Sequence, residues 1–485
     1  MRPSPLAAVC SLLLVGLVTA GCIIRVTRAD DDPLPNGGIT GPPADCRGGP
    51  KEGPAHDGVE PAGPRFVGRF DLTNPAQARF QWSGTEIQGR FEGTSIHASM
   101  RVPIVYLQVF EDNCQQRIAD YEKAHALDVT DETKALCSPF SPVVNAVCAQ
   151  DKACAATHRA CCKAVTTRMV VKIDDRPEGL LPVSQSFTDY TLAENLPFGI
   201  HTVRLHRGVE AFAGVFEFNG FTVPGGKLLP ARVRDRRILV IGDSITCAYG
   251  IKGANAQCRF SFDTEDTFNS YSVVAGRALD ADVEIVAFSG RGIWRNNDSE
   301  WEGTMPLLFD RTIPSAAQAL NLSMDPNDKT RQPTEVARPD PEKDAEGDKN
   351  IVRHDFAKAP KPHVILVNLG TNDFFVGLPS PMVLFRNQYL AFVRDLRGKY
   401  GFTDAHIILA IPPMISDALD DQPRSAIRAV LEEVVALMKD PRVYMMEFLD
   451  QGVRRGMGCD FHPNLATHAI MAEQLTGAIR AKTCW

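Results

Sequence analysis

After Arg237 the chain alternates between short apolar runs and helix-like segments, and this alternation constrains the fold more than any other feature of the sequence. The first run, Ile238 to Ile241, is continuously apolar, as expected for a strand that is buried on both faces of a sheet. Alternating strands and helices of this kind are typical of a parallel sheet covered by helices on both faces. We expect further strands at residues 283–288, 363–369, 406–411 and 443–448, helices at residues 270–279, 381–397, 424–438 and 464–481, and a charged surface loop at residues 325–358.

The preceding part of the chain has a different pattern, in which apolar and polar residues alternate with a period of two. Examples are Arg79 to Trp82, Ile87 to Phe91 and His201 to Leu205. Gly, Asn and Asp separate these runs, as in an all-β sandwich or jelly roll. The 485 residues are enough for two or three domains. We therefore expect a β-sandwich (jelly-roll) domain at residues 64–230 and an α/β domain at residues 231–485.

The N-terminus has the layout of an export signal. In residues 1–22 an apolar run follows Arg2, and it is too short to span a bilayer. Thr19-Ala20-Gly21-Cys22 resembles a bacterial lipoprotein box, in which Cys22 would be acylated, although a larger aliphatic residue is usual in place of Thr19. Ordinary signal cleavage near Ala20 is the alternative. Either way we expect an exported protein, either a membrane-anchored lipoprotein (periplasmic or at the cell surface) or a secreted protein, with residues 23–63 as a flexible tether rich in Gly, Pro and Asp.

The 13 cysteines fit an exported chain, because disulfides form in oxidising compartments. Six of them fall within residues 112–165, which we expect to be a disulfide-linked helical insertion in the β domain, most helix-like at residues 142–165. No C-x-x-C pair occurs there, so a zinc site is weakly supported. The six are Cys114, Cys137, Cys148, Cys154, Cys161 and Cys162. Two further pairs are expected, Cys247 with Cys258 and Cys459 with Cys484.

Four polar blocks follow expected strands or precede the last helix. The first is Ser244 in the sequence Gly-Asp-Ser, the second Gly290 in Ser-Gly-Arg-Gly, the third Asn372 in Gly-Thr-Asn-Asp, and the last His462 in Asp-Phe-His-Pro. Each block alone is a weak signal, because turns are rich in such residues. The carboxyl ends of parallel strands share one edge of the sheet, where open α/β sheets bind their ligands. We therefore expect the four blocks to meet there.

Together these residues supply what acyl transfer at an ester requires. Ser244 is the candidate nucleophile, His462 the base and Asp460 the group that orients the base. The candidate oxyanion donors are the N–H groups of Ser244 and Gly290 and the side-chain amide of Asn372, with Gly292 as the alternative to Gly290. The sequence contains no metal-ligand pattern and no Gly-rich phosphate loop, so we expect no metal and no cofactor.

The four blocks resemble those of the SGNH (GDSL-type) hydrolases, which have a flavodoxin-like parallel sheet. The chain is similar to the carbohydrate esterase family 2 acetylesterases, which join a jelly roll to an SGNH domain. Gly68-Arg69-Phe70, Trp82-Ser83-Gly84, Arg207 and Glu210 contribute to this similarity. The Asp-x-His spacing is tighter than the Asp-x-x-His of many SGNH enzymes. Because some family 2 esterases orient the histidine by a backbone carbonyl, the role of Asp460 stays open.

The resemblance implies a serine esterase that removes O-acetyl groups from polysaccharides or oligosaccharides through an acyl-enzyme. We expect it to be exported, as the N-terminus indicates, and to be a monomer. A GDSL-type lipase or arylesterase is one alternative, and a non-catalytic glycan-binding lipoprotein at the cell surface is another. Trp294 and Trp301 could stack on a sugar ring or pack in the core. The net charge of −7 argues against nucleic-acid binding, which requires a clustered basic face.

Overall fold

The computed structural model describes residues 38–41, 44–45, 62–103, 167–297, 303–314, 352–418, 421–451 and 455–485, and the backbone alone of residues 107–109 and 162–164. The expected signal with Cys22, most of the tether, most of the cysteine-rich insertion, most of the 325–358 loop and Trp301 lie outside the described residues. Among the helices that are described, none is both long and apolar enough to cross a membrane.

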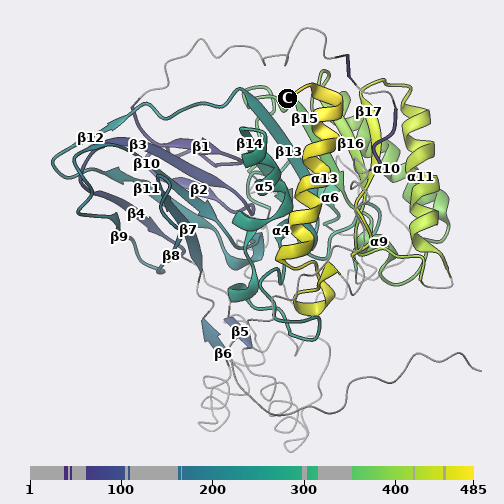
Figure 1. The fold of residues 1–485 in the computed structure, drawn as a ribbon, viewed down its shortest axis with the longest axis horizontal. Helices are drawn as coiled ribbons and strands as arrows, with labels where there is room; N and C mark the ends of the chain where they lie inside the picture. Colours follow the sequence, from purple (N-terminus) through teal and green to yellow (C-terminus); the bar gives the residue numbers. More distant parts are fainter. Residues whose placement is uncertain are drawn as a thin grey trace, which may run out of the picture. The chain divides into compact units, whose positions relative to one another are not determined.

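Five parallel strands form the sheet that carries the candidate site (Figure 1). They are β13 (Arg236–Gly242), β14 (Ala281–Ala287), β15 (Val364–Asn368), β16 (His406–Ile411) and β17 (Val443–Glu447). Their order is β14-β13-β15-β16-β17, so the first strand of the domain lies between the second and the third. This is the flavodoxin-like, doubly wound order, and it confirms the predicted fold class. In this order the chain reverses its winding between β13 and β15, where such sheets bind ligands.

Helices cover both faces of the sheet because alternate residues of each strand point to opposite sides. Ile238 and Val240 of β13 belong to a core shared with α5 and α13. Leu239 and Ile241 belong to a second core shared with α10 and α11. The four helices are α5 (Tyr271–Ala278), α10 (Met382–Arg397), α11 (Pro423–Met438) and α13 (Leu465–Thr483). Their bounds lie within a few residues of the expected ranges.

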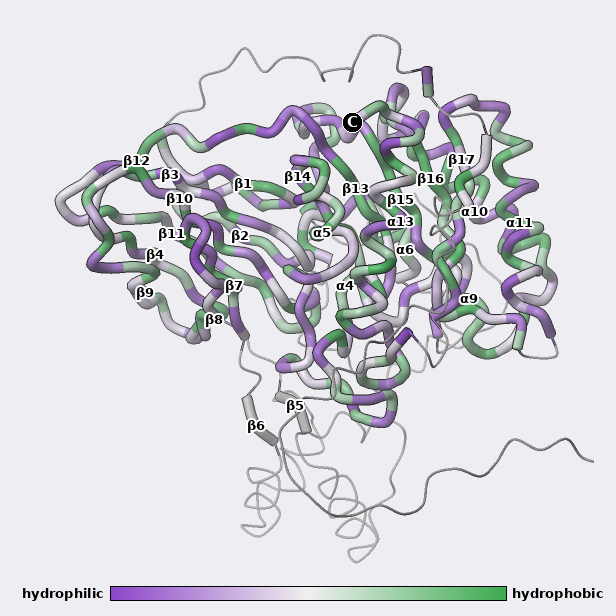
Figure 2. Tube along the Cα trace, in the orientation of Figure 1, coloured by the Kyte–Doolittle hydropathy of each residue, from purple (hydrophilic) through white to green (hydrophobic). Residues whose placement is uncertain are grey.

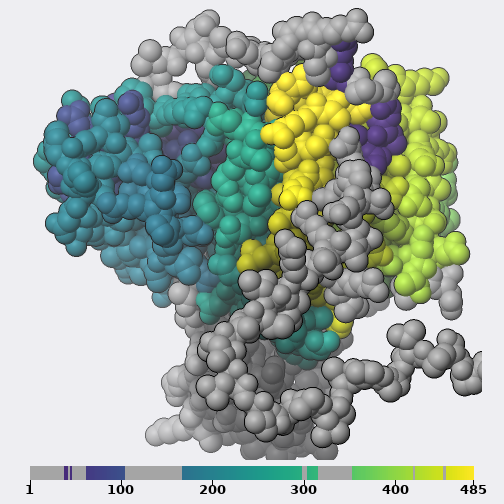
Figure 3. Space-filling model, in the orientation of Figure 1, coloured from purple at the N-terminus to yellow at the C-terminus, as the bar shows by residue number. Residues whose placement is uncertain are grey.

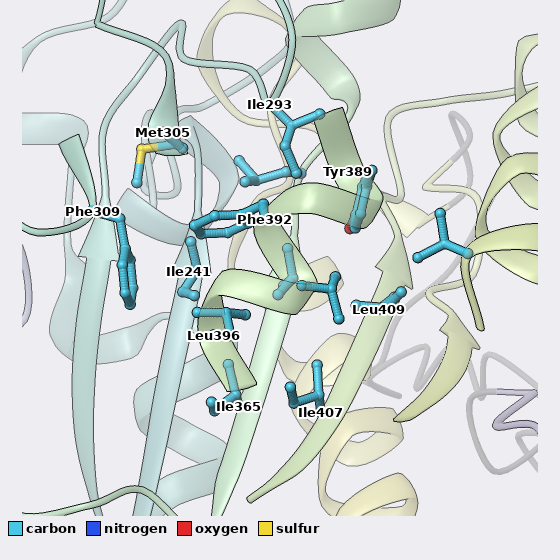
Figure 4. Packing of buried hydrophobic residues seen from close by; sticks show 14 of the residues in the cluster. Ile241, Ile293, Met305, Phe309, Ile365, Tyr389, Phe392, Leu396, Ile407 and Leu409 are labelled. Carbon is cyan, nitrogen blue, oxygen red and sulfur yellow. The ribbon is translucent and has the colours of Figure 1, made fainter. Parts of the chain in front are cut away.

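The second of these cores is formed by large aliphatic and aromatic side chains. In Figure 4, Phe392 and Leu396 of α10 lie close to Ile241 of β13 and Ile365 of β15. All four are buried, with at most 2% of their surface exposed. Figure 2 shows the middle of the parallel sheet as hydrophobic, as expected for strands covered on both faces. The buried sheet therefore gives a rigid support for the loops at its carboxyl edge.

The N-terminal β-sandwich consists of two antiparallel sheets, as the period-two pattern predicted. One has the order β1-β3-β10-β7-β8, with β12 paired to β3, and the other has the order β2-β11-β4-β9. The strands are β1 (Arg65–Val67), β2 (Ala78–Phe80), β3 (Glu86–Gly93), β4 (Ile96–Arg101), β7 (Arg168–Ile173), β8 (Gly179–Pro182), β9 (Thr188–Ala193), β10 (Gly199–Arg207), β11 (Phe216–Thr222) and β12 (Lys227–Leu229). Phe91 and Val203 from the first sheet share a core with Phe80 and Phe218 from the second.

The β-sandwich contacts the parallel sheet at its edge strand, β14. Arg65 of β1 forms an ion pair with Asp282 of β14. The buried Arg69 donates from Nε to Glu284 Oε1 over 2.8 Å. Gly84 approaches β14 so closely that a Cβ atom there would lie 2.5 Å from Ile285 Cδ1. The edge strand is thereby covered by the sandwich, which removes an open edge from the sheet.

Two expectations about local structure are wrong where the structure describes them. Cys162–Ala164 lies in the stretch expected to be helical, but it forms β6, which pairs antiparallel with β5 (Leu107–Val109). A three-residue strand of this kind is set by its partner and not by helical periodicity.

The expected tether also contains residues that are fixed to the α/β domain. Thr40 donates its N–H to Met445 O over 2.8 Å and accepts the Met445 N–H at its hydroxyl over 2.9 Å. Ala44 donates its N–H to Ala481 O over 2.7 Å. Figure 3 shows these N-terminal residues in purple against yellow and yellow-green residues of the C-terminal part. Because β17 is the edge strand of the sheet, its free backbone groups can bind a passing segment.

Candidate active site

Ser244 lies at the junction of β13 and α4 (Ser244–Cys247). Asp243 caps this short helix, since its Oδ1 accepts the Ile245 N–H over 3.0 Å. Gly242 is required at the end of the strand, because a Cβ atom there would lie 2.0 Å from Thr246 Oγ1. The turn therefore places the Ser244 side chain at the carboxyl edge of the sheet, on the strand where the winding reverses.

His462 is positioned to accept the proton of Ser244. Its Nε2 lies 2.8 Å from Ser244 Oγ, and its Nδ1 lies 2.9 Å from the backbone carbonyl oxygen of Asp460. A carbonyl can only accept, so Nδ1 carries the proton and Nε2 is left to accept from the hydroxyl. Burial lowers the pKa of His462 to about 4, because it disfavours the charged imidazolium, while the Asp460 carbonyl acts in the opposite direction. The imidazole is therefore neutral at neutral pH.

The carboxylate of Asp460 does not contact His462, contrary to the role expected for this side chain. It accepts the Tyr249 hydroxyl over 2.9 Å and the Phe260 N–H over 2.8 Å, both through Oδ2. The cause is the backbone, because Asp460 has φ 50° and ψ 41° and Phe461 has φ 62°, which turn the chain through the left-handed region. The sequence left two candidates for the group that orients His462, the Asp460 carboxylate and a backbone carbonyl. In the structure it is the backbone carbonyl of Asp460 that accepts from His462 Nδ1.

Two consecutive left-handed residues are strained, at roughly 1–2 kcal/mol each for side chains with a Cβ. The loop at residues 250–260 holds them in place. Asp460 donates its N–H to Cys258 O over 2.8 Å, and Phe461 donates its N–H to Ala256 O over 3.2 Å. Gly253 allows this approach, since a Cβ atom there would lie 2.3 Å from Cys459 N.

A disulfide joins the same two loops, and it differs from both expected pairs. Cys258 is bonded to Cys459, three residues before His462. Cys247 is a buried free thiol whose side chain lies in the core shared with α5. Cys484 is also disulfide-bonded, but Cys459 is not its partner. Both expected pairs are therefore wrong: Cys247 forms no disulfide, and Cys459 is bonded to Cys258 instead of Cys484.

An aromatic stack packs against the ring of the histidine, and no role for it is expected from the sequence pattern. The Tyr249 ring lies 4.2 Å from the His462 ring and 4.1 Å from the Phe260 ring, measured between centroids. Tyr249 is five residues after Ser244, at the end of the turn that follows α4. The tyrosine therefore links the nucleophile segment to the histidine loop by ring packing and by its hydroxyl group.

The candidate oxyanion donors lie on three adjacent strand ends. The backbone N–H groups of Ser244 and Gly290 have no hydrogen-bond partner among the described residues. The N–H of Gly292 donates to Asn296 Oδ1 over 3.2 Å, so of the two glycines Gly290 has the N–H that is available. Gly290 has φ +78°, a conformation that favours glycine.

The side-chain amide of Asn372 connects these strand ends. Its Nδ2 donates to Arg291 O over 3.0 Å and makes a longer contact of 3.4 Å with Asp243 Oδ2. The longer bond is the weaker one, so its N–H is the one that can turn to a substrate oxygen. Burial raises the pKa of Asp243 to about 7, because the carboxylate lies away from water.

Asp373 holds the loop that follows Gly290. Its carboxylate accepts three backbone N–H groups, from Ile293 over 2.9 Å, Trp294 over 2.8 Å and Arg295 over 3.0 Å. Burial raises the pKa of Asp373 to about 6, and the backbone donors oppose this shift. Trp294 is 9% exposed and belongs to the hydrophobic core, so packing is the correct interpretation of this residue.

The site is thus an arrangement of a nucleophile, a base and hydrogen-bond donors. Within the described residues no group of three or more His, Cys, Asp or Glu side chains could hold a metal ion. Ser244 and His462 are in contact, and their neighbours Gly290 and Asn372 lie on the adjoining strand ends. Such an arrangement can form an acyl-enzyme and stabilise the negative charge that develops on the attacked carbonyl oxygen.

Comparison with known families identifies the two domains. Residues 240–470 match the GDSL-like Lipase/Acylhydrolase family, and residues 66–135 and 152–231 match the family described as Carbohydrate esterase 2 N-terminal. The residues skipped by the second match, 136–151, fall within the cysteine-rich insertion. These matches confirm the resemblance stated from the four polar blocks.

Related proteins carry esterase names. Cellulase/esterase CelE of Acetivibrio thermocellus is 32% identical over 317 residues, which are 64% of this chain and 34% of that protein. The chain therefore spans about a third of the length of this relative. An acetylxylan esterase / glucomannan deacetylase of Cellvibrio japonicus is 27% identical over 292 residues, which are 59% of this chain and 68% of that protein.

The solved structures agree with the domain matches. A family two carbohydrate esterase from Clostridium thermocellum, in complex with cellohexaose, is 25% identical and covers 86% of this chain and 98% of its own, with a TM-score of 0.62. The likeness spans the β-sandwich as well as the parallel sheet. It confirms the predicted combination of the two folds in one chain.

Proposed function

Because the chain joins a GDSL-like lipase/acylhydrolase domain to a carbohydrate esterase 2 N-terminal domain, we propose that it is a serine esterase that removes O-acetyl groups from polysaccharides or oligosaccharides. The observation that carries the proposal is the 2.8 Å contact between Ser244 Oγ and His462 Nε2. This pair of side chains lies at the carboxyl edge of the sheet, where ligands bind, together with the Ser244 and Gly290 N–H groups that have no hydrogen-bond partner among the described residues.

The reaction would proceed in two steps. The Ser244 oxygen attacks the acetyl carbonyl as His462 takes the hydroxyl proton, and the proton then passes to the departing sugar oxygen. The resulting acetyl ester on Ser244 is attacked by a water whose proton goes to His462, which returns it to Ser244 as acetate leaves. The N–H groups of Ser244 and Gly290 and the Asn372 amide would bind the oxyanion in both steps.

The carbohydrate substrate class is supported by the relatives and by one exposed side chain. The named relatives are a cellulase/esterase and an acetylxylan esterase / glucomannan deacetylase. Phe461, which directly precedes His462, is 55% exposed and could offer its ring to a sugar. We propose that acetylated polysaccharide or oligosaccharide is the substrate.

The cellular location is part of the proposal. We propose that the chain is exported, that Cys22 is lipidated and anchors it to the membrane, and that it acts as a monomer. The Cys258–Cys459 disulfide supports export, since such bonds persist in oxidising compartments. We expect the full-length chain to incorporate radiolabelled palmitate and the Cys22→Ser variant to incorporate none. Equal labelling of the two proteins, or labelling of neither, would contradict lipidation at Cys22.

The catalytic proposal is tested by replacing the nucleophile. Ser244→Ala is expected to abolish acetate release from acetylated xylan, acetylated glucomannan and a chromogenic acetyl ester. Ser272→Ala is the matched control, since Ser272 is also buried but forms its side-chain hydrogen bond with Ser270 and not with Ser244 or His462. Acetate release by Ser244→Ala at the wild-type rate would overturn the proposal.

A second candidate, a lipase or arylesterase that acts on longer acyl chains, is favoured by the apolar surface next to Asn372. Phe375 is 70% exposed and Val376 is 50% exposed. A series of p-nitrophenyl esters from acetyl to octanoyl decides between the two functions. The acetylesterase predicts the highest kcat/KM for acetyl, and a preference beyond butyryl would support the second candidate.

A further inference from the structure

The β-sandwich places a carboxylate directly behind the loop that carries Gly290. Glu210 lies between β10 and the short helix η2 (Ala211–Ala213) and is fully buried. Its Oε1 accepts the Ser289 hydroxyl over 2.6 Å, and its Oε2 accepts the Ser289 N–H over 3.0 Å. Both hydrogen-bond donors of the residue before Gly290, its hydroxyl and its N–H, are therefore held by one side chain of the other domain.

Glu210 is itself fixed by charged neighbours. Glu265 Oε2 accepts the backbone N–H of Glu210 over 3.0 Å. The buried Arg207 guanidinium donates to Glu210 O over 2.7 Å and to Gly214 O over 2.9 Å. The backbone of Glu210 is thus held on both sides, and its carboxylate cannot move without breaking its two hydrogen bonds to Ser289.

The hydrogen bonds between Glu210 and Ser289 are not needed to hold the two domains together. The domains are also joined by the Arg65–Asp282 ion pair and by the bond between Arg69 and Glu284, which lie at the edge strand and use none of the loops of the site. A buried carboxylate is costly unless it is paired and hydrogen-bonded. Here it binds the one residue that sets the direction of the Gly290 N–H. Gly290 itself has φ +78° and no side chain that could be packed to hold it.

We propose that Glu210 is a positioning residue for the esterase reaction, which aims the Gly290 N–H at the oxyanion by holding Ser289. The inference rests on the proposed function and deepens it. The β-sandwich would then complete the active site of the α/β domain, in addition to any contact that it makes with a polysaccharide. Ser289 would transmit the effect, because its hydroxyl and its N–H are both bound to the same carboxylate.

The electrostatics of the cluster give a pH readout. Burial raises the pKa of Glu210 to about 7, because it disfavours the charged carboxylate. Burial and the nearby Glu210 charge raise the pKa of Glu265 as well, while the Arg207 guanidinium acts in the opposite direction. A carboxylate accepts stronger hydrogen bonds than a neutral carboxyl group. As the pH falls through the pKa of Glu210, its hold on Ser289 should weaken and kcat should drop to a lower plateau.

Two variants test the inference by different routes. Glu210→Gln keeps the size of the side chain but leaves one of the two Ser289 donors facing an amide N–H. We expect kcat to fall about 10- to 100-fold, while KM stays within about threefold of the wild-type value. This loss in kcat is no larger than the loss caused by removing an oxyanion donor outright. Ser289→Ala removes only the hydroxyl, so it tests the same contact even if Glu210→Gln folds poorly. The double variant should lose little more than Glu210→Gln, because both changes break one interaction.

The control and the overturning results follow from the same geometry. Asp282→Asn weakens the edge-strand ion pair and should lower Tm while leaving kcat unchanged. The pH step in kcat should be present in wild type and Asp282→Asn and absent in Glu210→Gln. Wild-type kcat in both Glu210→Gln and Ser289→Ala, or a pH step that persists in Glu210→Gln, would overturn the positioning role. When Ser244→Ala is inactive in the same assays, either of these overturning results counts against the positioning role of Glu210 and leaves the proposed function intact. Activity in Ser244→Ala would instead count against the proposed function.

Discussion

The histidine loop and the Gly290 loop meet at one edge of the sheet, but they are held by different kinds of contact. The turn around His462 is held by the Cys258–Cys459 disulfide and by backbone hydrogen bonds to the loop at residues 250–260. The loop around Gly290 is held by two buried carboxylates, Glu210 and Asp373, which accept backbone N–H groups. The first arrangement stabilises a strained backbone, and the second sets the direction of N–H donors. Removal of the disulfide should therefore impair the His462 loop, which we call the base side. Neutralisation of the buried carboxylates should impair the Gly290 loop, which we call the oxyanion side.

The largest effect is expected from protonation of the base. His462 must be neutral to accept the Ser244 proton, and burial lowers its pKa to about 4, so the active form is present above that pH and is lost below it. We expect kcat/KM to fall about tenfold per pH unit below about pH 4. Stopped assays with a chromogenic acetyl ester measure this limb. A tenfold fall per pH unit that begins at the ordinary histidine pKa of about 6.5 and continues without a plateau would contradict the burial argument.

The next effect tests the oxyanion side. Asn372→Ala removes the amide that connects the three strand ends, and loss of one donor costs roughly 2.7–4 kcal/mol, or about 10²- to 10³-fold in kcat. Asn387→Ala, in the exposed middle of α10, is the control with the same chemical change. Steady-state kinetics on the acetyl ester measure both. A loss below about threefold in Asn372→Ala would remove this residue from the oxyanion site.

Removal of the cross-link should affect the base side alone. In the double variant Cys258→Ser with Cys459→Ser, the left-handed turn before His462 loses its covalent support, and we expect kcat to fall about tenfold. The helical circular dichroism signal should persist at the assay temperature, because the bond lies in loops outside the sheet. Cys247→Ser is the control for the thiol that is free. Activity and ellipticity that vanish together would show that the bond supports the whole fold.

The smallest effect separates the backbone of Asp460 from its side chain. Asp460→Asn leaves the carbonyl that faces His462 Nδ1 and changes only the group that accepts from Tyr249 and Phe260. We expect a loss of kcat below about fivefold. A carboxylate that orients the histidine directly would instead cost about 10⁴-fold on replacement by an amide. A loss of that size would show that the carboxylate turns to the histidine in the working enzyme.

The sequence predicted the parts of this molecule that depend on local pattern. The strand from 406 to 411 was expected with its observed bounds, and the Ser244 and Asn372 blocks were expected at strand ends because apolar runs stop directly before them. The strand Thr188–Ala193 was not expected, since most of its residues are at least partly exposed and its apolar contrast is weak. Periodicity reports burial, so exposed strands escape it.

The parts that could not be predicted depend on contacts between distant segments. The Cys258–Cys459 bond joins residues 201 positions apart, and spacing in the chain favoured nearer partners. Glu210 and Ser289 are 79 positions apart and meet only because the β-sandwich covers β14. The left-handed backbone of Asp460 has no compositional signal, because neither Asp460 nor Phe461 is a glycine. Each of these features follows from the fold and not from the segment that carries it.

The central claim, that Ser244 forms an acyl-enzyme with His462 as its base, is tested most directly by trapping the intermediate. The protein is mixed with a chromogenic acetyl ester, quenched in acid within milliseconds, digested and analysed by mass spectrometry. We predict one acetyl group on Ser244, formed in the burst phase and missing in Ser244→Ala. Chromophore release with an unmodified Ser244 at every quench time would contradict the mechanism.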